Sequence, residues 1–206
     1  HLPEICRLAK KYHAQVMVDD AHGLGVLGPG GAGTVAHFGL TDSVDLIMGT
    51  FSKSLAAIGG FIASTERAIN YLMHHSRPFI FSASASPASV GAVLAALDVM
   101  QEEPERIERL RENAHFMRER LDAMGFDTCG SETAVIPIVV GEMERCFKMW
   151  KWLADEGIFI NPVVPPAVPP TRTLIRISVT AGHTRRQLTW AVKKLEEAGK
   201  LFGLLE

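Results

Sequence analysis

Two short segments of this chain carry the side chains best suited to chemistry, and each follows an apolar run. Asp19, Asp20 and His22 come after the first run, and Thr50 and Lys53 come after the second. A carboxylate can keep a pyridine nitrogen protonated, and a lysine amine can form a Schiff base with a carbonyl. The combination of an acid, a histidine and a Thr-x-x-Lys motif therefore predicts both halves of a pyridoxal phosphate site.

Each of these side chains also has a purely structural explanation. A lysine that follows a buried strand is partly desolvated, which favours the neutral amine that attacks carbonyls. Lys53 could equally be an ordinary surface group or a partner of Asp45. Asp19 and Asp20 could form a strand-end turn or a helix cap. The combination of the two segments, rather than either one, favours the cofactor site.

The elements that must position these residues are indicated by apolar periodicity. Residues 2–14 have the spacing of an amphipathic helix, and a second helix is expected to begin at Ser64 or Thr65. Apolar strands are expected at residues 15–20, 44–50 and 59–64, and a short strand or extended run is expected at residues 79–84. This alternation indicates an α/β fold with a largely parallel sheet, whose ligands bind beyond the carboxyl ends of the strands.

From Pro87 the pattern changes. Two helical stretches, which Pro104 kinks or separates, extend to Gly125. The elements expected next are a strand at 134–141, a helix at 143–157, a short strand at 158–162, a Pro-rich loop at 163–171, a strand at 173–180 and a helix at 184–200. The predicted organisation is a later part of a cofactor-binding large domain (1–86), connecting helices (87–125) and a small C-terminal α+β domain (126–206).

The composition excludes several classes of protein. The 206 residues carry 21 Lys and Arg against 23 Asp and Glu, so no basic surface for nucleic acid or an anionic membrane is indicated. Hydrophobic residues make up 47%, which is typical of a folded chain, and no apolar run approaches the ~20 residues that span a bilayer. Cys6, Cys129 and Cys146 form no disulfide framework, so a reducing, cytoplasmic location is expected.

Three other patterns carry less weight. Residues 23–28 match the GxGxxG dinucleotide motif, but Pro29 and the glycines after it cannot begin the helix that the motif needs, so a tight loop is expected. The prolines of residues 165–170 lie between two expected strands, which favours a stiff internal loop over a polyproline ligand. Asp19 and His22 have no third ligand nearby, so no metal site is predicted.

Several separated motifs occur in the order of one known family. VDDAHGLGVLG, GTFSKSLAAIGGFIA, FSASASP and LIRISVTAGHT resemble the α-oxoamine synthases, which are acyltransferases of the fold type I pyridoxal phosphate enzymes. That family includes serine palmitoyltransferase, 8-amino-7-oxononanoate synthase, 2-amino-3-ketobutyrate CoA ligase and 5-aminolevulinate synthase. The resemblance covers essentially the whole chain, and GTFSKSLAAIGGFIA is most similar to the serine palmitoyltransferase members.

The resemblance implies a role for the residues of the two reactive segments. Lys53 would be the Schiff-base lysine, and Asp19 would pair with the pyridine nitrogen of pyridoxal 5′-phosphate. His22 would contact the ring hydroxyl and help to orient the substrate carbonyl. These three are the expected catalytic residues, and Thr50 would bind the cofactor phosphate.

Further residues are implied to act from outside these segments. Ser82 and Ser84 match the hydroxyl segment that reaches the phosphate of the neighbouring subunit's cofactor, although Ala83 stands where family members often have Thr. Arg176 stands where the family places the arginine that holds the substrate carboxylate, and a guanidinium can grip that group with two hydrogen bonds. The implied assembly is a homodimer.

The implied reaction is a decarboxylating condensation of an amino acid, expected to be L-serine, with an acyl-CoA, giving an α-amino ketone, CoA and CO2. The alternatives are an 8-amino-7-oxononanoate synthase-type reaction of alanine with a pimeloyl donor, a glycine-using acyltransferase, an aminotransferase, and a non-catalytic fragment or partner subunit. The chain begins at His1 with a helix that leads directly into a strand, and family members are considerably longer. We therefore expect a C-terminal portion that alone is inactive, binds cofactor poorly and exposes apolar strand edges.

Overall fold

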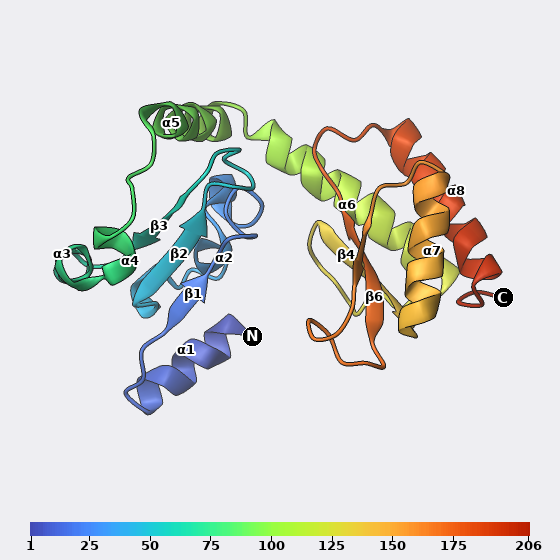
Figure 1. Ribbon diagram of the computed structural model, residues 1–206, viewed down its shortest axis with the longest axis horizontal. Coiled ribbons are helices and arrows are strands. Elements are labelled where there is room, and N and C mark those ends of the chain that lie inside the picture. Colours follow the sequence, from blue (N-terminus) through green and yellow to red (C-terminus); the bar gives the residue numbers. More distant parts are fainter. The chain divides into compact units, whose positions relative to one another are not determined.

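The computed structural model describes residues 1–206, and the chain forms two compact units, His1–Ile107 and Glu108–Glu206. The boundary between them falls within helix α6 (Glu105–Met124). Figure 1 labels most of the helices and strands of both units. The finer division into residues 1–86, 87–125 and 126–206 stays a prediction.

The first unit is built around a three-stranded sheet in the order β1-β2-β3. Its elements in chain order are α1 (Leu2–Lys11), β1 (Met17–Asp19), η1 (Pro29–Gly31), α2 (Thr34–His37), η2 (Thr41–Ser43), β2 (Leu46–Thr50), β3 (Gly60–Ala63), α3 (Glu66–His75), α4 (Arg77–Ile80) and α5 (Pro87–Glu102). The Thr65 hydroxyl caps α3 by accepting a hydrogen bond from the amide of Ala68.

The two strand pairs of this sheet run in different directions. β1 and β2 are parallel, with Asp19 opposite Met48, whereas β2 and β3 are antiparallel, with Thr50 opposite Gly60. A parallel crossover needs a dozen or more residues, and the link between Thr50 and Gly60 is too short for one. The sheet of this unit is therefore mixed, and its parallel pair carries the two reactive segments.

The short strand expected at residues 79–84 does not form. Phe79 and Ile80 complete helix α4, where their amides both donate to the carbonyl of Ser76, and residues 81–84 are irregular. A short apolar run does not distinguish a strand from a helix by periodicity alone. Phe79 and Phe81 are also 62% and 82% exposed, so this apolar run is not a buried strand in the chain described here.

Three predictions are confirmed: the break at Pro104, the tight loop at the GxGxxG residues and the loop in the Pro-rich segment. α5 ends at Glu102 and α6 begins at Glu105, because proline cannot supply an interior helical amide. The GxGxxG residues form a loop that leads into the short turn η1 rather than a helix. Irregular chain also connects the strands on either side of the Pro-rich segment.

The second unit has a three-stranded antiparallel sheet in the order β4-β6-β5. Its elements after α6 are β4 (Val135–Gly141), α7 (Met143–Asp155), β5 (Asn161–Val163), β6 (Thr173–Ser178) and α8 (Arg185–Leu201). A complete capping box starts α8: the Thr184 hydroxyl accepts from the amide of Gln187, and the Gln187 side chain accepts from the amide of Thr184.

The core of this unit lies on one face of its sheet. Alternate residues of β4 and β6 are buried there, as the two-residue period of a strand requires. They belong to one cluster with side chains of the three helices: Met117 and Leu121 of α6, Met149 and Leu153 of α7, and Leu188 and Leu195 of α8. The intervening residues of β6, including Arg176, point to the other face.

Candidate active site

The structure brings the two reactive segments to the same edge of the first sheet. Asp19 is the last residue of β1, and Thr50 is the last residue of β2. Because these strands are parallel and adjacent, with Asp19 opposite Met48, their carboxyl ends meet at one edge. Lys53 follows Thr50 by three residues and lies in the loop that leaves this edge.

The loops that leave the two strands are held together. The Ser54 hydroxyl donates a 2.7 Å hydrogen bond to the carbonyl of Leu24. Gly25 has a φ of +76°, and a Cβ atom there would lie 2.4 Å from the Cβ of Ser54. Leu55 is only 2% exposed and anchors the lysine loop in the interior of the unit. The two residues that follow Lys53 therefore hold the loop in place, Ser54 by its hydrogen bond and Leu55 by its buried side chain.

The two aspartates have different environments. Asp20 is buried, and its carboxylate accepts hydrogen bonds from the amide of Thr34 at 2.7 Å and from the Thr34 hydroxyl at 2.5 Å. Asp19 is exposed, and its carboxylate accepts the amide of Ala21 at 3.0 Å. An ionised carboxylate has about four acceptor positions, so Asp19 retains capacity for a further donor. Asp20 is a structural group, and Asp19 is the accessible acid of the pair.

Lys53 is exposed in this chain, contrary to the partial burial expected from its position after a strand. The predicted alternative, a pair with Asp45, also does not form: Asp45 lies before β2 and Lys53 after it, so the two are at opposite ends of the strand. The Asp45 carboxylate accepts the amide of Val16 at 2.7 Å. The carbonyl of Lys53 accepts the amide of Ala56, whose φ of +50° is rare for a residue with a side chain. The amine therefore extends from a tight, constrained turn.

Thr50 and His22 are the other predicted groups at this edge. The Thr50 hydroxyl lies 2.9 Å from the Ser52 hydroxyl and donates to the carbonyl of Gly59 at 3.2 Å. His22 is exposed in the turn that follows β1. A carboxylate, an imidazole, a hydroxyl and an amine thus meet at one accessible edge, and this donor set fits the ring nitrogen, phosphate and aldehyde carbon of pyridoxal phosphate.

Ser82 and Ser84 lie apart from this set of groups. Both are exposed in the irregular segment between α4 and α5, and neither is hydrogen-bonded to Thr50 or Lys53. The structure of a single chain therefore gives them no contact with the candidate site.

Arg176 belongs to the second unit. It lies in the middle of β6, between Pro137 of β4 and Asn161 of β5. Its Nε atom is buried and has no hydrogen-bond partner. A buried donor without an acceptor is costly, and native structures rarely keep one without a reason. A bound carboxylate would satisfy this atom, and carboxylate binding by Arg176, which the family resemblance implies, stays a prediction.

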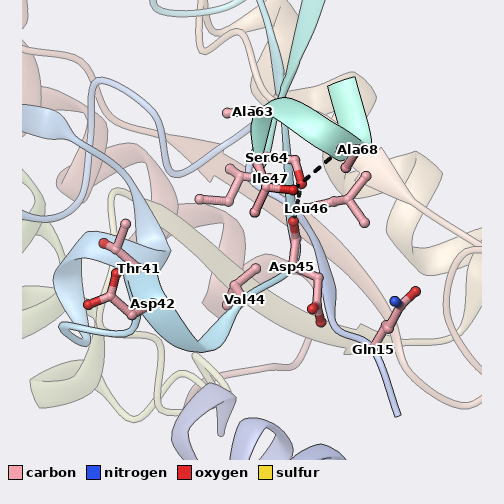
Figure 2. Close-up of a pocket in the computed structure, with 11 residues that line it drawn as sticks. Gln15, Thr41, Asp42, Val44, Asp45, Leu46, Ile47, Ala63, Ser64 and Ala68 are labelled. Atoms are coloured by element: carbon pink, nitrogen blue, oxygen red, sulfur yellow. Dashed lines mark hydrogen bonds between the residues drawn. The ribbon is translucent and has the colours of Figure 1, made fainter. Parts of the chain in front are cut away.

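A cavity lies at the opposite edge of the first sheet, away from these groups (Figure 2). This cavity of about 640 Å³ is lined at the amino end of β2 by Val44 and Asp45, and Ser64 at the end of β3 donates to the carbonyl of Asp45. None of the predicted site residues lines it. No group of three or more His, Cys, Asp or Glu side chains could hold a metal ion, and no helix is both long and apolar enough to cross a membrane.

Sequence reasoning missed Ser54 and Asn161. Ser54 stands beside the lysine, but its partner Leu24 is thirty residues away, so no local pattern signals the contact. Asn161 is separated from Arg176 by the Pro-rich segment, and only the strand register shows that the two are neighbours.

Comparison with known sequences identifies the class of protein to which this fold and these groups belong. The chain belongs to the aminotransferase class I and II family, which matches residues 1–195. Its fold is that of the type I pyridoxal phosphate-dependent transferases, so the family and fold expected from the sequence are confirmed.

Particular relatives are similar over the full length of the chain. It is 51% identical over 205 residues to a serine palmitoyltransferase of Bacteroides ovatus, covering 100% of this chain and 52% of that protein. It is 44% identical over 204 residues to an 8-amino-7-oxononanoate synthase of Thermosipho melanesiensis, covering 99% and 52%. The chain therefore spans about half the length of these curated relatives.

A solved structure of SPT with PLP internal aldimine superposes with a TM-score of 0.92 at 35% identity, covering 99% of this chain and 52% of that one. The cofactor that the sequence predicts is the one that this neighbouring structure holds.

Proposed function

We propose that this chain is part of a pyridoxal phosphate-dependent acyltransferase that condenses L-serine with an acyl-CoA and releases CoA and CO2. The observation that carries the proposal is the joint position of Asp19 and Lys53 at the carboxyl edge of two adjacent parallel strands. The hydrogen bond from Ser54 to Leu24, which ties their loops together, supports it. Serine is favoured as the substrate because the identity to a serine palmitoyltransferase is 51%, against 44% to an 8-amino-7-oxononanoate synthase.

When bound, the cofactor supplies a cationic ring that delocalises the electron pair left on the substrate α-carbon. Lys53 would hold the cofactor through its amine and, once the substrate displaces that amine, accept the α-proton at Nζ. The Asp19 carboxylate would accept the ring N–H and so keep the ring cationic. The Thr50 hydroxyl would bind the phosphate, and His22 would orient the ring hydroxyl and the substrate carbonyl.

The remaining predicted roles belong to the same proposal. Arg176 would bind the amino-acid carboxylate with its guanidinium, whose Nε has no protein partner. Ser82 and Ser84 would approach the cofactor phosphate of a second subunit in a homodimer. The expected cytoplasmic location is supported by the three cysteines, which are all free.

The second candidate is an acyltransferase of the 8-amino-7-oxononanoate synthase type, which would take alanine and a pimeloyl donor. The 44% identity to such an enzyme over almost the whole chain favours it over a glycine-using acyltransferase or an aminotransferase. All four share the Schiff-base lysine, so Lys53 does not discriminate among them. The last alternative, a non-catalytic fragment or partner subunit, predicts no turnover.

Release of free thiol from acyl-CoA by the full-length protein tests the proposal. Palmitoyl-CoA and pimeloyl-CoA are each supplied with L-serine, L-alanine and glycine, and the Lys53→Ala variant measures the background. We expect the fastest release with palmitoyl-CoA and L-serine. Faster release with pimeloyl-CoA and L-alanine would favour the second candidate. Amino-group exchange with a keto acid and no thiol release would instead show an aminotransferase and contradict the proposal.

A further inference from the structure

Asn161 and Arg176 are direct neighbours across two strands of the second unit. They lie opposite each other in the antiparallel pair of β5 and β6. Residues in this relationship share one face of the sheet, with their Cβ atoms about 4.5–5.5 Å apart. Asn161 is exposed, so its side chain remains accessible to a ligand on the face that it shares with Arg176.

Of the two cross-strand neighbours of Arg176, only Asn161 has a polar side chain. Pro137 lies opposite Arg176 on β4, and its side chain has neither a donor nor an acceptor. Ile175 and Ile177, the adjacent residues of β6, are buried on the core face. Arg176 takes part in no salt bridge, so no carboxylate of this chain neutralises the guanidinium.

The unpartnered Nε of Arg176 indicates that an anionic ligand completes this face. A guanidinium binds a carboxylate through two parallel hydrogen bonds. A carboxylate has about four acceptor positions, so two remain after the guanidinium is bound. The Asn161 side chain carries an NH2 group on the same face of the sheet and can donate to one of them.

We propose that Asn161 is a second substrate-binding residue, whose amide N–H donates to the carboxylate of the amino acid that Arg176 holds. This inference rests on the proposed function, because that function supplies the carboxylate. Since all amino acids share this group, Asn161 contributes to the affinity for every amino-acid substrate rather than selecting among side chains. The neutral amide adds a hydrogen bond without competing for the positive charge of Arg176.

The test is a binding titration of the full-length protein with its cofactor, in which L-serine, L-alanine and glycine are followed by the change in cofactor absorbance. We expect Asn161→Ala to weaken all three by similar factors of about tenfold or more, the usual size for a hydrogen bond to a charged group. Asn161→Asp should weaken them further, because its carboxylate repels that of the ligand and neutralises Arg176. Asn70→Ala, which removes an exposed asparagine from α3, is the matched control and should leave all three affinities unchanged.

A double-variant cycle with Arg176→Lys separates this inference from the proposed function. If both residues bind one carboxylate, Asn161→Ala should have a smaller effect in the Arg176→Lys protein than in the parent. If Arg176→Lys weakens binding and Asn161→Ala does not, the inference about Asn161 is overturned while the role of Arg176 stands. If the parent binds no amino acid, the proposed function itself fails.

Loss of affinity for L-serine alone would also overturn the inference, because it would place the Asn161 amide on the substrate hydroxyl. Should Asn161→Ala fail to fold, as judged from its thermal unfolding curve, Asn161→Ser replaces it in the same titrations. Serine keeps the strand polar at this position but is too short to reach the carboxylate, so the same outcomes apply.

Discussion

The hydroxyl of Ser54 donates a 2.7 Å hydrogen bond to the backbone carbonyl of Leu24, and this contact joins the loop that carries Lys53 to the loop that carries His22. Each loop follows a different strand of the parallel pair, so the contact fixes one reactive segment against the other. Gly25 packs directly against Ser54, which leaves no room for a side chain at that position. The separation of the amine from the acid therefore depends on two small residues that carry no chemistry themselves.

Gly25→Ala should destabilise the protein more than Gly30→Ala. Both glycines have positive φ, which costs an alanine about 1–2 kcal/mol. At Gly25 the added Cβ would also lie 2.4 Å from the Cβ of Ser54, whereas at Gly30 nothing lies within 4 Å. We expect a loss of unfolding free energy of about 1 kcal/mol for Gly30→Ala and of about 2 kcal/mol or more for Gly25→Ala, measured by urea denaturation. Equal losses would show that the packing against Ser54 is not tight.

Asp20→Asn and Asp19→Asn should have opposite consequences for stability and for cofactor binding. Asp20 is buried and accepts two hydrogen bonds from Thr34, so replacing one acceptor oxygen with an NH2 group should cost about 1–3 kcal/mol of unfolding free energy. Asp19 is exposed, and its replacement should change stability by less than about 0.5 kcal/mol. By its proposed role, however, Asp19→Asn should shift the cofactor absorbance and weaken cofactor binding. The assignment of the two acids would be reversed if Asp20→Asn alone altered the absorbance.

Lys53→Ala should abolish the covalent link to the cofactor. In the parent protein, borohydride reduction should fix pyridoxal phosphate on Lys53, and peptide mass spectrometry should locate the adduct there. Lys10→Ala, which removes an exposed lysine from α1, serves as the control and should keep the adduct. An adduct that persists on another lysine in Lys53→Ala would show that the Schiff base forms elsewhere.

Cys146 should resist alkylation in the folded protein while Cys129 reacts. Cys146 is buried in α7, and burial raises the pKa of its thiol above the ordinary value of 9.0, whereas Cys129 is exposed. Treatment with iodoacetamide at pH 8.5, followed by mass spectrometry, distinguishes the two thiols. Labelling of both at equal rates would contradict the burial of Cys146.

The raised pKa of the Cys146 thiol also makes the free energy of unfolding fall as pH rises above 9.0. As pH rises past 9.0, the unfolded chain loses the Cys146 proton before the folded chain does. The contribution of this thiol to unfolding free energy is therefore complete below pH 9 and is lost as pH rises through the folded pKa. Cys146→Ala should show a shallower decline of unfolding free energy above pH 9 than the parent. An identical decline would rule out this thiol as the cause.

The sequence by itself determined the local elements and the residues that bear chemistry. The helical spacing of residues 2–14, the apolar run before Asp19 and the proline at 104 each act over a few neighbouring residues, so their structural consequences follow from sequence order. The motif around Lys53 and its distance from Asp19 indicated the cofactor class, and the family comparison agrees with that prediction.

Only the tertiary structure decided which neighbours those residues have and which of them are accessible. Local sequence does not distinguish Asp19 from Asp20, and it was the distant Thr34 that bound one carboxylate and left the other accessible. Strand register alone placed Asn161 beside Arg176, across a loop of prolines. The apolar run at residues 79–84 proved helical at its start and exposed, because short runs fit either conformation and are decided by what packs against them. Contacts between distant residues depend on the whole fold, whereas sequence patterns report only on near neighbours.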